Sequence, residues 1–168
     1  MRRLISALAV TGCLMTSFPS IVLANQGFTL WSGVKRENQL PAHMQFGGNR
    51  YSTDRYVLTI PAKKMKLAVA QFAITYPEYY DGTFDENKIE VRVKGKSLPL
   101  SEVKWNKAGN IIEIFPEEPV PAGNTVELVF SNVQNPPFGG MYYFNCQILS
   151  PGDLPLLRYL GSWVLSID

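Results

Sequence analysis

Short runs of alternating apolar and polar residues recur along this chain, and no long helical period accompanies them. In the segment 89–94 (IEVRVK), apolar side chains alternate with charged ones, which is the pattern of a half-buried strand. Gly, Pro, Asn and Asp separate such runs, and roughly eight to ten short strands of this kind predict two sheets packed face to face. We therefore expect an all-β fold, an antiparallel, immunoglobulin-like β-sandwich with little helix.

The remaining strand-like runs differ in how many faces they bury. The segment 67–75 is apolar on both faces, which is typical of a central strand. In the segment 142–148, one face carries Tyr142, Phe144, Cys146 and Ile148. Further strand-like runs lie at 55–60, 111–115, 126–131 and 163–167.

The first 24 residues have the features of an export signal. Arg2 and Arg3 precede an apolar run, and the small residues near Ala24 suit cleavage. We expect a signal peptide at 1–24, an N-terminal extension and loop at 25–50, and the β-sandwich domain at 51–168. The run Val10-Thr11-Gly12-Cys13 also fits a lipoprotein processing box, with Cys13 as the anchor, but the apolar residues that follow it favour ordinary cleavage.

The charge balance argues against a nucleic-acid ligand. The chain has 16 basic and 14 acidic residues, and two of the basic ones belong to the predicted signal, so the rest is formally neutral. Nucleic-acid binding needs clustered positive charge, and we interpret Lys63, Lys64 and Lys66 as the solvated start of a strand. After cleavage Cys146 is the only cysteine, so no internal disulfide can form.

The segment 132–149 (NVQNPPFGGMYYFNCQIL) combines prolines, paired glycines and a strand-like run. Proline cannot donate to a sheet ladder, so Asn135-Pro136-Pro137 ends a strand. Gly139-Gly140 permits a turn that other residues resist, and a strand rather than a helix follows. We therefore interpret Asn135, Pro136, Gly139 and Gly140 as a structural corner rather than as a ligand loop.

Several short motifs follow one another in a fixed order along the chain. They are "YVLTIP" at 56–61, "PVPAGNTV" at 119–126, Asn135-Pro136 with Gly139-Gly140, Tyr142 and Phe144, Ser150-Pro151-Gly152, and Leu160-Gly161. In their order and spacing, the chain resembles an exported cyanobacterial family, domain of unknown function 2808. The resemblance covers roughly residues 50 to 165, and it implies an exported β-rich domain in the periplasm, cell envelope or thylakoid lumen, with no known activity.

No set of residues converges on catalysis, a metal or a cofactor, so we predict none of these. His43 next to Met44 makes too small a copper site, and Cys146 lies among apolar neighbours that favour a buried, unreactive thiol. The acidic residues of the segment 78–86 (Glu78, Asp81, Asp85 and Glu86) do not have the spacing of a calcium loop, so we expect a solvated loop there.

The segment 76–80 (YPEYY) supplies the best candidate contact residues. Tyr76, Tyr79 and Tyr80 lie beside Pro77, and exposed aromatic rings bind proteins or stack on sugars. We expect a non-catalytic exported module that binds a protein partner or assembly. The alternatives are a carbohydrate-binding module that uses these tyrosines, a hydrolase with unidentified carboxylates, and tyrosines that merely cover the end of the sandwich.

The predicted cleavage can be tested directly. The intact mass of the exported protein is expected to match a chain that begins at Asn25. A mass that begins at Cys13 and includes a diacylglycerol adduct would establish the lipoprotein alternative instead.

Overall fold

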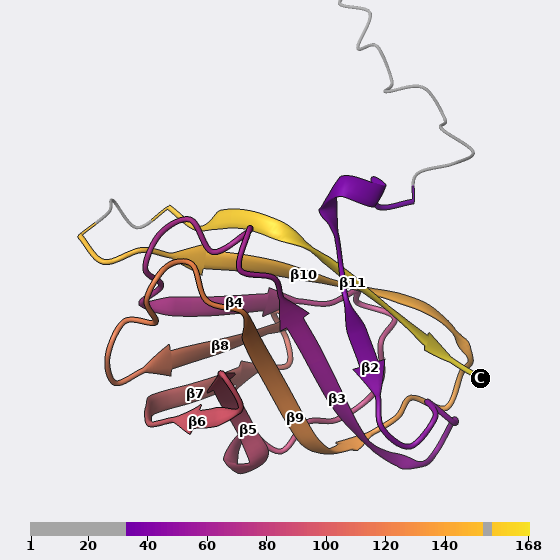
Figure 1. Ribbon diagram of the computed structural model, residues 1–168. Coiled ribbons are helices and arrows are strands. Elements are labelled where there is room, and N and C mark those ends of the chain that lie inside the picture. Colours follow the sequence, from indigo (N-terminus) through magenta and orange to yellow (C-terminus); the bar gives the residue numbers. More distant parts are fainter. Residues whose placement is uncertain (1–32, 153–155) are drawn as a thin grey trace, which may run out of the picture. The chain divides into compact units, whose positions relative to one another are not determined.

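The computed structural model describes residues 33–152 and 156–168, which form two packed β-sheets (Figure 1). The predicted immunoglobulin-like β-sandwich is therefore confirmed, whereas the predicted signal peptide at 1–24 lies outside the described residues. The first sheet contains, in spatial order, β1 (Gln39–Leu40), β11 (Arg158–Ile167), β10 (Gly140–Leu149), β4 (Gln71–Thr75), β8 (Ile111–Pro116) and β7 (Leu100–Asn106). The second contains β2 (Ala42–Met44), β3 (Thr53–Ile60), β9 (Val126–Gln134), β5 (Ile89–Val93) and β6 (Lys96–Leu98).

Neighbouring strands pair antiparallel in both sheets, with the single parallel pair β1–β11 among the described strands. The alternation in the sequence matches the burial of the strands. In β3, every second residue from Asp54 to Ile60 is buried, and β10 alternates in the same way from Tyr142 to Ile148. Within residues 33–152 and 156–168, the helical segments are η1 (Arg36–Asn38) and η2 (Glu86–Lys88), and each is a single 3-10 turn.

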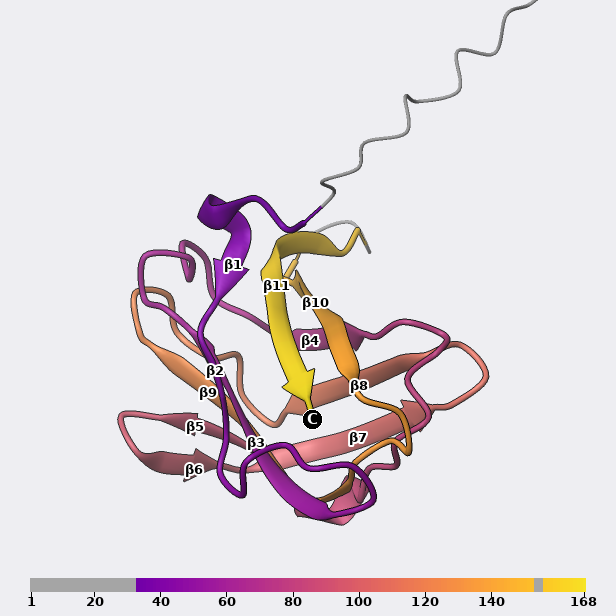
Figure 2. The same ribbon diagram turned by 90° about the vertical axis from the view of Figure 1, so that its right-hand side faces the viewer.

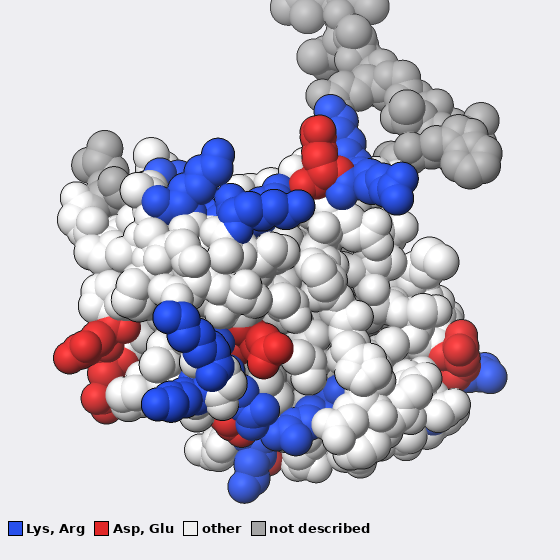
Figure 3. All heavy atoms as spheres, in the orientation of Figure 1, with Lys and Arg blue, Asp and Glu red and all other residues white. Residues whose placement is uncertain are grey.

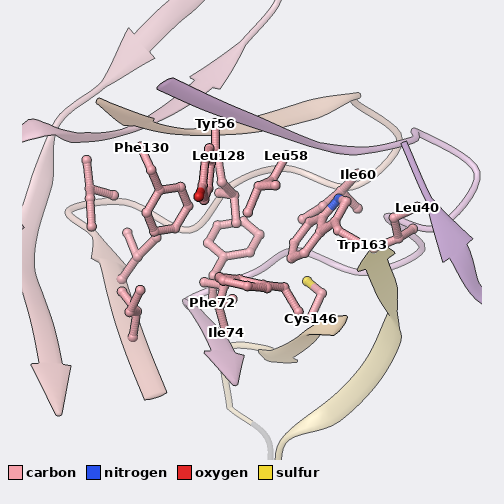
Figure 4. Packing of buried hydrophobic residues seen from close by; sticks show 14 of the residues in the cluster. Leu40, Tyr56, Leu58, Ile60, Phe72, Ile74, Leu128, Phe130, Cys146 and Trp163 are labelled. Carbon is pink, nitrogen blue, oxygen red and sulfur yellow. The ribbon is translucent and has the colours of Figure 1, made fainter. Parts of the chain in front are cut away.

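The core lies between the two sheets and is almost entirely apolar (Figure 4). Trp163 is fully buried, and its indole Nε1 donates to the carbonyl of Thr59, 3.0 Å away on the opposite sheet. This bond satisfies the one polar atom of the largest core side chain, as burial requires. Cys146 lies beside this tryptophan in the close-up and is fully buried, and burial raises the pKa of its thiol. The expectation of a buried cysteine is therefore confirmed.

The segment 39–44 passes from one sheet to the other. β1 pairs with β11 in the first sheet, and after Pro41 the chain continues as β2 beside β3 in the second sheet (Figure 2). The sequence prediction assigns these residues to an extension and loop, because strands of two or three residues leave no alternation to detect. We propose that the sandwich domain includes them and begins before residue 39.

The parallel strand β1 approaches β11 closely at Gly161. A Cβ atom at Gly161 would lie 2.5 Å from the carbonyl oxygen of Asn38 and 2.8 Å from Cγ of Leu40, which is itself buried in the core. Real Cβ atoms do not come this near to backbone oxygens, so the position requires glycine for reasons of space.

Gly161→Ala is therefore expected to lower the free energy of unfolding by about 1–3 kcal/mol, because β1 must shift and withdraw Leu40. Gly140→Ala is the matched control, since Gly140 has almost the same φ (158° against 159°) and its Cβ position has no neighbour nearer than Cε2 of Tyr142 at 4.0 Å. Chemical denaturation of the two variants provides the measurement. Equal stability would show that β1 does not pack as described.

Candidate functional site: an aromatic end of the sandwich

Three loops meet at the end of the sandwich where β3 and β10 begin. They are the β2–β3 loop (45–52), the loop from β4 to η2 (76–85) and the β9–β10 loop (135–139). Backbone hydrogen bonds join them: the N–H of Asn135 donates to the carbonyl of Ser52, and residues Thr83 and Gln134 exchange both their backbone bonds. The sequence-predicted corner and the sequence-predicted tyrosine loop are thus neighbours in space.

The buried carboxylate of Asp54 organises the β2–β3 loop. Its Oδ2 accepts a hydrogen bond from the backbone N–H of Gly48 at 2.8 Å, and its Oδ1 accepts from the N–H groups of Phe46 (2.9 Å) and Arg55 (2.6 Å). A carboxylate that is fully buried needs such donors to offset its lost hydration. The loop therefore has a fixed backbone although its side chains face solvent.

The side chain of Asn135 joins this loop to the core. Its Oδ1 accepts a hydrogen bond from the hydroxyl of Tyr56, and its Nδ2 donates to the carbonyl of Asn49 at 2.8 Å. The hydroxyl of Tyr80 lies 3.1 Å from that of Tyr56, and because Tyr56 already donates to Asn135, Tyr80 is the donor of this bond. Burial raises the pKa of both tyrosines, so the network stays protonated at neutral pH.

The three tyrosines predicted as contact residues do not form a shared exposed surface. Tyr76 and Tyr80 are only 6% and 3% exposed, and their rings pack against Phe144 in the core. Tyr79 alone faces solvent, 63% exposed, with its ring tilted over that of Tyr142 at 5.6 Å. Tyr76 and Tyr80 turn inward because the backbone of the loop is tied to β9 and the apolar interior continues to this end.

Four other large apolar side chains are exposed at this end of the sandwich. They come from the β2–β3 loop, the β9–β10 loop and the start of β10, and the larger part of each side chain faces solvent. They are Phe46 (57%), Tyr51 (72%), Phe138 (71%) and Met141 (62%), and with Tyr79 we call them the aromatic end. The surface over the β2–β3 loop is nearly free of charged side chains, apart from one group of opposite charges beside the C-terminus (Figure 3).

Tyr51 has a backbone conformation that disfavours its side chain. Its φ angle is 58°, in the left-handed region, which costs a residue with a Cβ atom about 1–2 kcal/mol. The neighbouring loop holds it there, since its N–H donates to the carbonyl of Pro136 and its own carbonyl accepts from Nε2 of Gln134. Strain of this kind at an exposed aromatic residue is typical of functional loops.

The corner between β9 and β10 agrees only in part with the sequence interpretation. Gly139 does not adopt a positive φ, whereas Gly140 has a φ of 158°, a conformation that L side chains rarely adopt. Gly139 instead provides room, because a Cβ atom there would lie 3.0 Å from the carbonyl oxygen of Ile167. Pro136 is buried beneath the loop.

Sequence reasoning misses Phe46, Tyr51, Phe138 and Met141. Phe46 precedes Gly47-Gly48, and Phe138 lies between two prolines and two glycines. An aromatic residue inside such a loop cannot easily be buried, and this signal would have identified both positions. Nothing in the sequence places these loops at the same end, because that depends on the strand order.

The other candidate residues considered in the sequence analysis do not come together into a site. Within the described residues, no three His, Cys, Asp or Glu side chains are grouped to hold a metal ion. His43 is exposed on β2. In the acidic loop, Asp85 caps η2 by accepting from the N–H of Asn87, and Glu86 accepts from the N–H of Trp105, so both serve the fold.

Comparison with known proteins places the chain in a family. The family described as protein of unknown function (DUF2808) matches residues 28–167, and the chain belongs to it. A comparison with curated proteins finds no match. Among solved structures, BslA, a bacterial hydrophobin, is similar with a TM-score of 0.50 and 19% identity, over 77% of this chain and 95% of that one.

Two further structures are less similar. The collagen-binding domain of a Staphylococcus aureus adhesin has a TM-score of 0.45 and 9% identity, over 76% of this chain and 95% of that one. An uncharacterised immunoglobulin-like protein of Nocardia farcinica has a TM-score of 0.44 and 11% identity, over 77% and 97%. At these identities the likeness concerns the fold. In the described part of the chain, no helix is long and apolar enough to cross a membrane.

Asn135→Ala is expected to lower the free energy of unfolding by about 1–3 kcal/mol, because it removes the acceptor of the buried Tyr56 hydroxyl. Asn124→Ala is the control, since the Asn124 amide donates only to carbonyls of its own turn. Thermal melting of both variants tests this. If Asn135→Ala melts no lower than Asn124→Ala, the network does not anchor the loops.

Proposed function

We propose that this protein is an exported, non-catalytic module that binds a protein partner or assembly through its aromatic end. The observation that carries the proposal is the grouping of five large apolar side chains, each more than half exposed, at one end of the sandwich. Soluble domains expose such groups where they bind something, and binding residues commonly lie on loops fixed to a rigid scaffold.

The composition of the aromatic end favours a protein over a sugar. Tyrosine, phenylalanine and methionine are enriched in protein interfaces, and all three occur here. A sugar-binding platform of three neighbouring tyrosines is not available, because Tyr76 and Tyr80 are buried. The fixed loops favour affinity as well, since a loop backbone that Asp54 and Asn135 already hold in place loses little freedom on binding.

Export is part of the proposal and rests on the predicted signal at 1–24 together with the cyanobacterial setting that the family resemblance implies. The location would be the periplasm, the cell envelope or the thylakoid lumen. The absence of a catalytic role is supported by the scattered carboxylates and the buried thiol of Cys146.

Tyr51→Asn provides a sharp test because stability and binding should change in opposite directions. Asparagine tolerates a left-handed φ, so the variant is expected to be as stable as the wild type or about 1 kcal/mol more stable. Removing the ring is expected to weaken partner capture at least roughly tenfold, the effect of losing an interface hot spot. Phe138→Ser should do the same, and both are compared by quantitative pull-down from soluble envelope or luminal extract.

Tyr159→Ser is the control, since it removes an exposed aromatic ring at the other end of β11. A partner retained equally by Tyr51→Asn, Phe138→Ser and Tyr159→Ser would contradict the assignment of the aromatic end. Binding to a defined glycan that is lost on Tyr79→Ala would support the carbohydrate-binding alternative instead.

A further inference from the structure

The opposite end of the sandwich has a different chemistry. Here β3 and β10 finish and β11 begins, so the surface is built by the β3–β4 loop (61–70), the start of β11 and the segment around η1. Lysine and arginine side chains extend along this face at the top of Figure 3. We call it the basic end.

The cations come from three distant parts of the sequence. Lys64 and Lys66 belong to the β3–β4 loop, and together with Arg158 they line a hollow of about 190 Å³ whose other walls include Ile148 and Leu160. Lys63 lies in the same loop, and Lys35 and Arg36 lie at the start of the described chain, where Asn38 meets Gly161. Among the described residues, the three lysines of the loop make no ion pair.

Few acidic groups oppose this charge. Glu37 lies next to Arg36 on η1. Glu117 and Glu118 belong to the β8–β9 loop, where they line a separate hollow with Leu98 and Pro99. The acidic groups at the left of Figure 3 lie below the basic face rather than on it.

Aliphatic side chains are exposed among these cations. Leu67 is 44% exposed beside Lys66, and Leu156 and Leu157 are 69% and 38% exposed just before Arg158. A folded domain has little reason to expose leucines next to lysines for solubility alone. Apolar side chains that project from a basic surface are the combination that binds anionic membrane surfaces, since the leucines enter the acyl boundary while the cations meet the head groups.

We propose that the basic end docks on the surface of a bilayer that contains anionic lipid. A soluble anion would use Lys64, Lys66 and Arg158 and leave the leucines in water, whereas a lipid leaflet engages both. The three loop lysines, which the sequence alone assigns to a solvated strand start, gain this role because the fold brings Arg158 and the leucines beside them. The proposal is independent of the aromatic end.

Vesicle co-sedimentation of the processed, exported chain tests the proposal. Binding is expected to vesicles of phosphatidylcholine with phosphatidylglycerol, to weaken as salt screens the charges, and to be absent with phosphatidylcholine alone. Each lysine near an anionic leaflet strengthens partitioning of the protein onto vesicles about fivefold. The double variant Lys64→Glu with Lys66→Glu is therefore expected to reduce vesicle binding more than about tenfold. Leu156→Ser with Leu157→Ser should reduce it at unchanged charge.

The matched control is Lys88→Glu with Lys107→Glu, which changes the charge equally on two exposed lysines next to loops of the aromatic end. It is expected to leave vesicle binding near the wild-type level. Thermal melting of every variant shows that the fold is kept. Equal loss in both lysine pairs, equal binding to neutral vesicles, or no binding to anionic ones would overturn the proposal. Displacement from vesicles by millimolar inorganic phosphate would also overturn it, because it would identify a soluble anion as the ligand.

Discussion

The burial of two alternating apolar faces against each other is the constraint on which the rest of this structure depends. Each sheet can cover its apolar face only with the other sheet, and Trp163 and Tyr56 fill the space between them. Their polar atoms then need partners, and these partners are a carbonyl of the facing sheet for Trp163 and the amide of Asn135 for Tyr56. Through Asn135, the packing of the core extends to the positions of the exposed loops.

The sequence is most informative where one residue type repeats at a fixed spacing. The alternation of apolar and polar residues in β3 and β10 can be recognised in the sequence, so these strands and the burial of Cys146 could be predicted. β1 and β2 could not, because their place depends on the space beside Gly161 and on pairing with strands far away in sequence. Central burial was also predicted over too long a segment, since only 71–75 of the run 67–75 is a strand.

The candidate site, like the fold, could be predicted from the sequence only in part. The sequence identifies both the tyrosine loop and the proline-glycine corner as candidate segments. In the structure, however, several of their residues have other roles than the sequence predicts. Tyr76 and Tyr80 are core residues, because the apolar interior extends beneath their loop. Glycine at position 139 is required by the close approach of the Ile167 carbonyl and not by a left-handed φ. Tyr51 and Phe138 could be recognised as partners in one surface only after the strand order had placed their loops together.

The length of β10 and β11 has a consequence for how such a domain could work. Both strands have ten residues and run from one end of the sandwich to the other, which corresponds to about 30 Å of extended chain. The potential of a charged leaflet decays over about 8 Å in physiological salt. A partner held at the aromatic end of a docked domain would therefore stand well outside the membrane's electric field. The sandwich would act as a rigid spacer. The strand length would set the distance between the partner and the membrane surface, independently of the lipid charge.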